Sequence, residues 1–127
     1  MDGILNLENF DTSLAEGLML LTPFAADATD DLTVNFVNTY KEQYGDTPIQ
    51  FAADAYDCLY AIKNAAEKAN VTPDMSVSDI CDALETAMPE ITFNGLTGEN
   101  IKFNSDGEPD KAPKAVVIKD GAYVLAD

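Results

Sequence analysis

The chain has 127 residues, a length typical of one folded domain, and its hydrophobic content of 46% is that of a globular protein. Its seven basic residues are all lysines, it has no histidine, and 23 carboxylates give it a net charge of −16. Because nucleic acids and anionic membranes are bound largely through Lys and Arg side chains, this charge argues against both kinds of partner.

The lack of histidine also excludes most hydrolytic mechanisms. Without histidine and with only two cysteines, zinc sites, Ser-His-Asp triads and Cys-His dyads are unavailable, and the spacing of Cys58 and Cys81 fits no metal motif. Paired carboxylates are a remaining catalytic option in principle. With 23 acidic residues in the chain, however, the adjacency of two of them carries little information. We therefore predict no enzyme, no cofactor, no catalytic residue and no metal ligand.

The sequence predicts neither a membrane span nor a leader. No run approaches the roughly 20 apolar residues that cross a bilayer, and no basic segment with an apolar run after it opens the chain. Met1 is followed directly by Asp2 and Gly3, as in a chain that is entered in the middle of a domain. Two interpretations follow: a cytoplasmic protein, or a processed or truncated chain.

The first predicted elements are a strand and a helix. Residues 17–21 form a short apolar run that ends at Thr22-Pro23, which predicts a buried strand because the run is too short for a helix. A helix is expected to follow as far as Tyr44, with Gly45 as its C-terminal cap. Its apolar stripe comprises Thr33, Phe36, Val37, Tyr40 and Tyr44.

Two further helices are predicted. The first opens near Phe51 and ends at Asn70, and its wide apolar face is rich in small residues. That face comprises Ala55, Leu59, Ile62, Ala66 and Ala69, with Tyr56, Cys58 and Ala65 beside it. The second begins at Ser76, where Asp79 completes a pattern like a capping box, and Pro89 ends it. Its inner face comprises Val77, Ile80, Cys81, Leu84, Ala87 and Met88.

The rest of the chain is predicted to be β. The expected strands are residues 91–93, 100–104, 115–119 and 122–125. Asp120-Gly121 is a strong signal for a two-residue hairpin, because such a turn needs positive φ at both central positions. One strand, three helices and four strands, in that order, predict an α/β fold.

Three stretches carry a resemblance to a known family. They are residues 15–19 (AEGLM), residues 51–57 (FAADAYD), and residues 91–108 (ITFNGLTGENIKFNSDGE) with the V-V-I-K-D-G-x-Y-V hairpin after them. Together they resemble the type I periplasmic binding proteins, specifically the branched-chain amino-acid group that serves ABC transporters. The resemblance covers nearly the whole chain, but only the last third or so of a family member.

The resemblance implies part of a type I periplasmic-binding-protein fold, with three helices, a mid-chain strand and C-terminal β-hairpins. Family members have two doubly wound α/β lobes, and the chain crosses the hinge between them three times. Residues 1–127 would be a single C-terminal segment of such a protein. Residues 1–23 and 114–127 would then belong to the second lobe, and residues 24–113 to the first.

The resemblance also implies two substrate-binding residues. Phe51 matches an aromatic residue that touches the ligand side chain in the family, and Asp54 lies one turn on, where the helix dipole favours an anion. A core aromatic and an ordinary first-turn acid are the structural alternatives. Tyr56 is interpreted as core, and Asp2 lies close to the family's ammonium-binding carboxylate without clearly matching it.

The function implied is that of the extracytoplasmic solute-binding component of an ABC importer for amino acids, with an ABC permease as partner. A sensory domain of the same fold is the alternative, followed by an enzyme with paired carboxylates and by a fragment that binds nothing. If most of the pocket is missing, free amino acids should bind no tighter than about 1 mM. Apolar faces left uncovered should then produce a homo-oligomer.

Cys58 and Cys81 lie on consecutive predicted helices joined by a short loop. Antiparallel packing of those helices could bring the two thiols together, and an extracytoplasmic parent permits a disulfide. Buried free thiols are the alternative.

Overall fold

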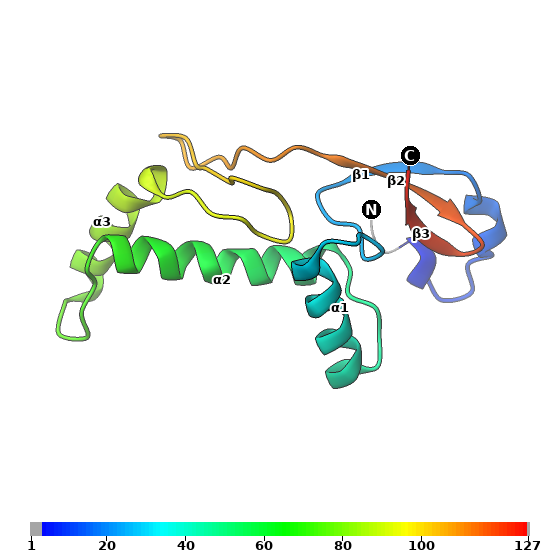
Figure 1. The fold of residues 1–127 in the computed structure, drawn as a ribbon, viewed down its shortest axis with the longest axis horizontal. Helices are drawn as coiled ribbons and strands as arrows, with labels where there is room; N and C mark the ends of the chain where they lie inside the picture. Colours follow the sequence, from blue (N-terminus) through cyan, green and yellow to red (C-terminus); the bar gives the residue numbers. More distant parts are fainter. Residues whose placement is uncertain (1–3, 127) are drawn as a thin grey trace. The chain divides into compact units, whose positions relative to one another are not determined.

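A computed structural model of the chain describes residues 4–126. The helices of that range are α1 (Asp31–Tyr44), α2 (Gln50–Lys68) and α3 (Val77–Ala87), and its strands are β1 (Met19–Thr22), β2 (Lys114–Lys119) and β3 (Ala122–Leu125) (Figure 1). The chain divides into two compact units. The sheet unit contains the residues up to Ala53 and those from Ala112 onward, and the helix unit is Asp54–Lys111.

The strands of the sheet unit form an antiparallel sheet in which β2 lies between β1 and β3 (Figure 1). Leu20 of β1 pairs with Val116 of β2. Because side chains alternate along a strand, the two residues point to the same face as Ile118. All three are buried and share a core cluster with Ala15 and Ala25. The hydrophobic core of the sheet unit therefore lies on this face of the sheet, and its residues come from both ends of the chain.

The hairpin predicted at Asp120-Gly121 is confirmed. Asp120 has a φ of 51° and Gly121 a φ of 73°, the left-handed backbone that a two-residue hairpin turn of this type requires at both positions. The Asp120 N–H also donates to the carboxylate of Glu16, at 3.0 Å from Oε2. The turn is therefore fixed both by its own geometry and by a contact to the segment before β1.

Helix α1 begins and ends at cap residues. Its N-cap is Asp30, whose carboxylate accepts from the Thr33 N–H at 2.9 Å. Its C-cap is Gly45, with a φ of 77°, whose N–H donates to the Lys41 carbonyl. The predicted stripe is confirmed at Thr33 and Val37, which are buried, but Tyr44 is exposed because the helix ends there.

The N-cap of α1 carries a pH-dependent contribution to stability. Burial by itself would raise the pKa of Asp30. The hydrogen bonds from Thr33 and the positive charge of Lys114 oppose burial, and the net pKa lies below the ordinary value of 3.8. A carboxyl with a lower pKa in the folded than in the unfolded state stabilises the fold above its unfolded pKa. That stabilisation is lost as the pH falls through the folded pKa.

We expect Asp30→Ala to destabilise the sheet unit by about 1 kcal/mol near pH 7, the usual cost of a lost N-cap. Asp30→Asn keeps a capping oxygen but cannot ionise, so its deficit relative to the wild type should shrink at about pH 3. Urea unfolding of the wild type and of Asp30→Asn, at about pH 7 and at about pH 3, measures the deficit at each pH. If the deficit is the same at both pH values, the ionised carboxylate of Asp30 does not supply the pH-dependent stabilisation.

Helix α3 begins as predicted. Ser76 is its N-cap: the hydroxyl accepts from the Asp79 N–H at 3.2 Å and donates to the Asp79 carboxylate at 2.7 Å. A 3-10 turn that contains Pro89 (Met88–Glu90) follows the helix. One core cluster of the helix unit lies where α3 and this turn meet α2, and its buried members are Ala61, Ala65, Ala87 and Ile91.

The prediction for the inner face of α2 is wrong. Asp57, Ala61 and Ala65 are the buried residues along the helix unit's part of α2, whereas Leu59 and Ile62 are 66% and 51% exposed. Residues spaced by four lie on one side of a helix, and here that side is lined by alanines small enough for neighbouring segments to come close. The apolar pattern of the sequence predicted burial of the larger residues Leu59 and Ile62, and it gave no reason to expect a buried carboxylate at Asp57.

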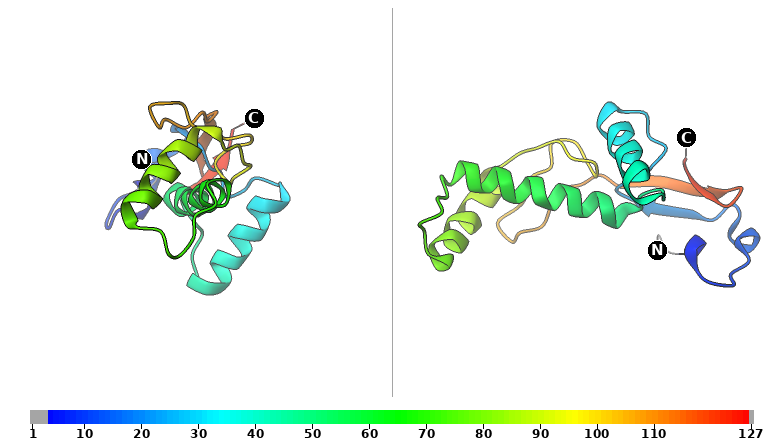
Figure 2. Two further views of the ribbon diagram at one scale, coloured as in Figure 1. Left: turned by 90° about the vertical axis from the view of Figure 1, so that its left-hand side faces the viewer. Right: turned by 90° about the horizontal axis from the view of Figure 1, so that it is seen from below.

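The strands predicted between residues 91 and 104 are reduced to isolated pairs. Phe93 and Ile101 exchange two backbone hydrogen bonds, of 3.2 and 2.8 Å, and Phe103 forms a single bridge with Pro109. Proline has no N–H to extend a ladder, so pairing stops there. The segment instead runs along α2, as the right-hand view of Figure 2 shows.

The two thiols are free, and both are exposed. Neither the disulfide nor the alternative of buried thiols is therefore correct. Leu84 and Ala87 of α3 lie in or against the core cluster with Ala61 and Ala65 of α2, and the cysteines lie outside that cluster. Consecutive helices do pack together, but through other faces than those that carry the cysteines.

Candidate ligand pocket

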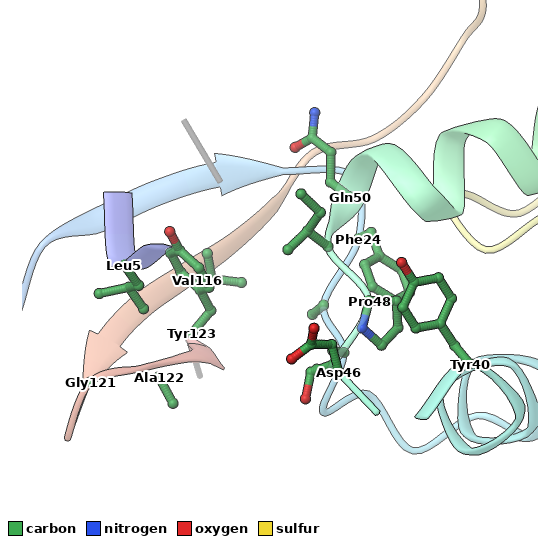
Figure 3. Close-up of a pocket in the computed structure, with 14 residues that line it drawn as sticks. Leu5, Phe24, Tyr40, Asp46, Pro48, Gln50, Val116, Gly121, Ala122 and Tyr123 are labelled. Carbon is green, nitrogen blue, oxygen red and sulfur yellow. The ribbon is translucent and has the colours of Figure 1, made fainter. Parts of the chain in front are cut away.

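The sheet unit contains a pocket of about 580 Å³ (Figure 3). This volume falls within the range of small-molecule sites. All of the residues that line it belong to the sheet unit. They are Leu5, Phe24, Ala25, Ala26, Tyr40, Asp46, Thr47, Pro48, Ile49, Gln50, Val116, Gly121, Ala122 and Tyr123.

One wall of the pocket is aromatic. Pro23 ends β1, and the next residue, Phe24, is buried with its ring edge-on to Phe36 of α1 at a centroid distance of 6.0 Å. Phe36 in turn contacts Tyr40 at 5.9 Å. Edge-on and tilted contacts at these distances are favourable arrangements for aromatic rings. They hold Phe24 and Tyr40 side by side on the pocket wall.

The connection between α1 and α2 forms the second wall. It leaves α1 at Gly45, and Pro48 within it is buried. At its end the hydroxyl of Thr22, the last residue of β1, lies 2.9 Å from Oε1 of Gln50. The same hydroxyl oxygen accepts from the Phe24 N–H at 3.3 Å. These bonds fix the start of α2 against the end of β1.

Strands β2 and β3 supply the third wall through Val116 and Tyr123. The hairpin is held to the loop after β1 by a hydrogen bond of 2.9 Å from the Leu125 N–H to Oδ2 of Asp27. Figure 3 shows the strand side chains facing the connection across the open space. Segments far apart in the sequence therefore converge on the pocket.

Most of the described residues that line the pocket are apolar or aromatic, and Asp46, an exposed residue, is the one charged residue among them. Figure 3 shows the Asp46 carboxylate pointing from the connection toward the strands. None of the seven lysines of the chain is among the lining residues. Such a pocket suits an apolar ligand body that carries a positive group, and it offers no cationic side chain to an anion.

The two residues predicted to bind substrate do not line this pocket. Phe51 directly follows Gln50, which does line it, but the Phe51 side chain is 60% exposed. Asp54 belongs to the helix unit, where it forms an ion pair with Lys111 at 3.4 Å. Their roles toward a ligand stay predictions. Asp2 lies outside the described residues.

Tyr56, interpreted from the sequence as core, is half-buried and contacts Tyr60 with ring centroids 4.7 Å apart. The hydrogen bond with Tyr60 raises the pKa of Tyr56 to about 12, and burial and the charge of Asp57 act in the same direction. The phenol therefore stays protonated across the physiological range.

Asp57 is the residue of consequence that the sequence analysis missed. It is 2% exposed, and its carboxylate accepts hydrogen bonds from the Leu96 N–H at 2.8 Å and from the Thr97 N–H at 2.9 Å. The Thr97 hydroxyl donates a third bond at 2.5 Å. The only signal in the sequence was the turn-rich stretch 94–98, which indicates a loop but not its partner.

Across residues 4–126, no cluster of cysteine and acidic side chains is arranged to hold a metal ion. The helices of the described range are all too short or too polar to cross a bilayer.

The arrangement of elements is shared with solved structures. One is a leucine-binding protein from Thermotoga maritima, with 24% identity and a TM-score of 0.68 over 89% of this chain and 31% of that one. Another is an ABC transporter substrate-binding protein from Desulfitobacterium hafniense in complex with Leu, with 22% identity and a TM-score of 0.73 over 90% and 32% of the two chains. A putative branched-chain amino acid ABC transporter from Rhodospirillum rubrum has 26% identity and a TM-score of 0.64, over 93% and 35%.

These similarities define the fold as α/β, of the type I periplasmic-binding-protein kind, as the sequence resemblance predicted. The chain spans about a third of the length of each of these structures. The family model described as "Periplasmic binding protein" matches residues 6–122, and the chain belongs to that family. No curated protein matches it significantly.

Proposed function

We propose that the chain acts in the solute-binding component of an ABC importer for amino acids of the branched-chain type. The observation that carries the proposal is a pocket whose described lining combines aliphatic and aromatic residues with one carboxylate, in a chain of the periplasmic binding protein family. An aliphatic side chain fits such a lining, and an ammonium group fits Asp46. Relatives of the same fold are described as leucine-binding or as in complex with Leu, which supports this class of ligand.

The proposal includes an extracytoplasmic location, an ABC permease as partner and binding without chemical conversion. In the whole protein, two lobes would close on the solute, and the permease would recognise the closed form. We assign residues 1–23 and 114–127 to the second lobe and residues 24–113 to the first. The compact units of the chain divide elsewhere, after Ala53 and after Lys111. The two divisions differ because the compact units follow from contacts within this chain, whereas the lobes are parts of the whole protein.

A sensory role is the second candidate. Two proteins of the same fold, both from Rhodopseudomonas palustris, are described as extracellular ligand-binding receptors. The same pocket would serve a receptor equally well, because binding and closure are common to import and to sensing. The two candidates differ in the partner that recognises the closed form.

NMR titration of the chain with leucine, isoleucine and valine tests the function. We expect changes confined to residues of the pocket that saturate at millimolar concentrations, because the pocket provides no cationic partner for the α-carboxylate. Glucose, a neutral solute without an ammonium group, is the control and should cause none. If no branched-chain amino acid perturbs the pocket, the proposed function fails.

Light scattering of the same sample tests self-association. Met19 and Leu21 of β1 are 61% and 73% exposed on the face of the sheet opposite the core, and β1 is an edge strand among the described residues. Exposed apolar faces and unpaired strand edges favour pairing between copies. We expect a homodimer or larger assembly. A monomer would contradict the expected self-association. A monomer that also binds leucine with micromolar affinity would contradict the expected weak binding as well.

A further inference from the structure

The electrostatics of the pocket are one-sided. Among the described residues of its lining Asp46 is the single charged one, and the chain as a whole carries a net charge of −16. Such a field raises the local concentration of cations and lowers that of anions. A ligand with a positive end is therefore favoured both before it enters the pocket and within it.

The rest of the lining suits a compact apolar body. Ile49, Pro48 and Val116 provide aliphatic surface, while Tyr40 and Tyr123 provide aromatic rings. An ammonium group close to such rings gains a further attraction from their faces. The pocket thus combines an apolar chamber, aromatic rings and a carboxylate, which are the elements that recognise an organic ammonium ion.

An amino acid carries an α-carboxylate for which this pocket has no cationic partner among its lining side chains. Its α-carboxylate lies one carbon from its ammonium group, so an ammonium placed on Asp46 brings two carboxylates together. The lining contains no lysine to balance the second one, so the carboxylate of the ligand is repelled by Asp46 without a cationic partner. The same side chain without the carboxylate avoids this cost.

We propose that this pocket recognises the ammonium and side-chain end of its ligand. In this chain it therefore binds a small primary amine with a branched aliphatic body more tightly than the corresponding amino acid. This inference rests on the proposed function and deepens it, because it assigns one end of the solute to residues of the sheet unit. Asp46 is the residue that sets the preference for a positive charge.

NMR titration at about 150 mM salt, which screens diffuse attraction, compares four probes. We expect 3-methylbutylamine to perturb the pocket residues and to bind about fivefold more tightly than leucine. The matched anion, 4-methylpentanoate, should not bind. Methylamine carries the charge without the apolar body, so it should bind at least about fivefold more weakly than 3-methylbutylamine if the chamber contributes.

Two variants locate the effect. Asp46→Asn should weaken binding of 3-methylbutylamine about fivefold, near the upper end for a solvent-accessible ion pair. Asp31→Asn, at an exposed acid of α1 that does not line the pocket, should leave that binding within about twofold. Asp46→Lys should reverse the preference and allow 4-methylpentanoate to bind.

The outcomes separate this inference from the proposed function. If leucine perturbs the pocket and the amine binds no more tightly, the amine preference is wrong while the solute-binding function stands. Equal losses in Asp46→Asn and Asp31→Asn would show diffuse attraction to an acidic surface and would also overturn the inference. An amine that binds more tightly than leucine and depends on Asp46 supports it, whatever the natural solute.

Discussion

Replacement of Asp57 by alanine is expected to lower the free energy of unfolding of the helix unit by about 3 kcal/mol. The Asp57 carboxylate is the acceptor for the N–H groups of Leu96 and Thr97 and for the Thr97 hydroxyl. All three residues are buried. Each buried donor left without an acceptor costs about 1–3 kcal/mol, and the losses overlap because one group serves all three donors.

Urea unfolding and amide hydrogen exchange measure this effect, with exchange at residues 91–104 reporting on the helix unit. Asp54→Ala, one turn earlier on α2, is the matched control. The carboxylate of Asp54 pairs with Lys111 at 3.4 Å but keeps a third of its surface exposed, so its loss should cost at most about 1 kcal/mol. If the two variants prove equally stable, the three bonds to Asp57 do not hold the loop.

Most of the local structure could be predicted because its causes are local. The N-cap of α3 at Ser76, the C-cap of α1 at Gly45 and the hairpin turn at Asp120-Gly121 all follow from residues within a few positions of one another. A cap or a two-residue turn depends on backbone geometry and on one or two nearby hydrogen bonds. Such signals need no knowledge of the rest of the fold.

The faces of α2 could not be predicted because they depend on distant segments. The helix carries apolar residues on more than one side, and burial of Asp57 rather than Leu59 is decided by the loop 94–98, about 40 residues away. A carboxylate is among the least expected residues at a buried position unless its partners are known. The error over the cysteines has the same origin, since their exposure depends on which faces of α2 and α3 meet.

The pocket was not predicted either, although the family was. Phe24, Asp46 and Tyr123 come from a loop after β1, a helix connection and a hairpin, and only the tertiary fold brings them to one place. The resemblance indicated Phe51, and the structure places its immediate neighbour, Gln50, in the lining. Motifs identified the class of protein, but the positions of the side chains depend on long-range packing.

Replacement of Gly95 by alanine is the second large effect expected. A Cβ at position 95 would collide with the carboxylate of Asp57, which is held in place by three hydrogen bonds. We expect the helix unit to lose about 2–3 kcal/mol, as in other overpacked interiors. Gly98→Ala in the same loop is the control, because the atoms nearest to its Cβ would be those of the Ile101 side chain, from 3.2 Å, and Cγ of Lys111, at 4.0 Å. The contact with Ile101 is tight but longer than the collision at Gly95 and calls for a shift of only a few tenths of an ångström, so the loss should be smaller.

The double variant Asp57→Ala/Gly95→Ala makes the cause specific. Without the carboxylate, the new methyl group enters the space that the carboxylate left, so the second substitution should add little to the first. The free energy of unfolding lost in the double variant should therefore be about 2 kcal/mol smaller than the sum of the two single losses, a difference within the range seen for residues in direct contact. Urea unfolding of the four chains gives this coupling directly. If the two losses add in full, Gly95 is required for some other reason, such as the backbone conformation of the loop, and its contact with Asp57 is incidental.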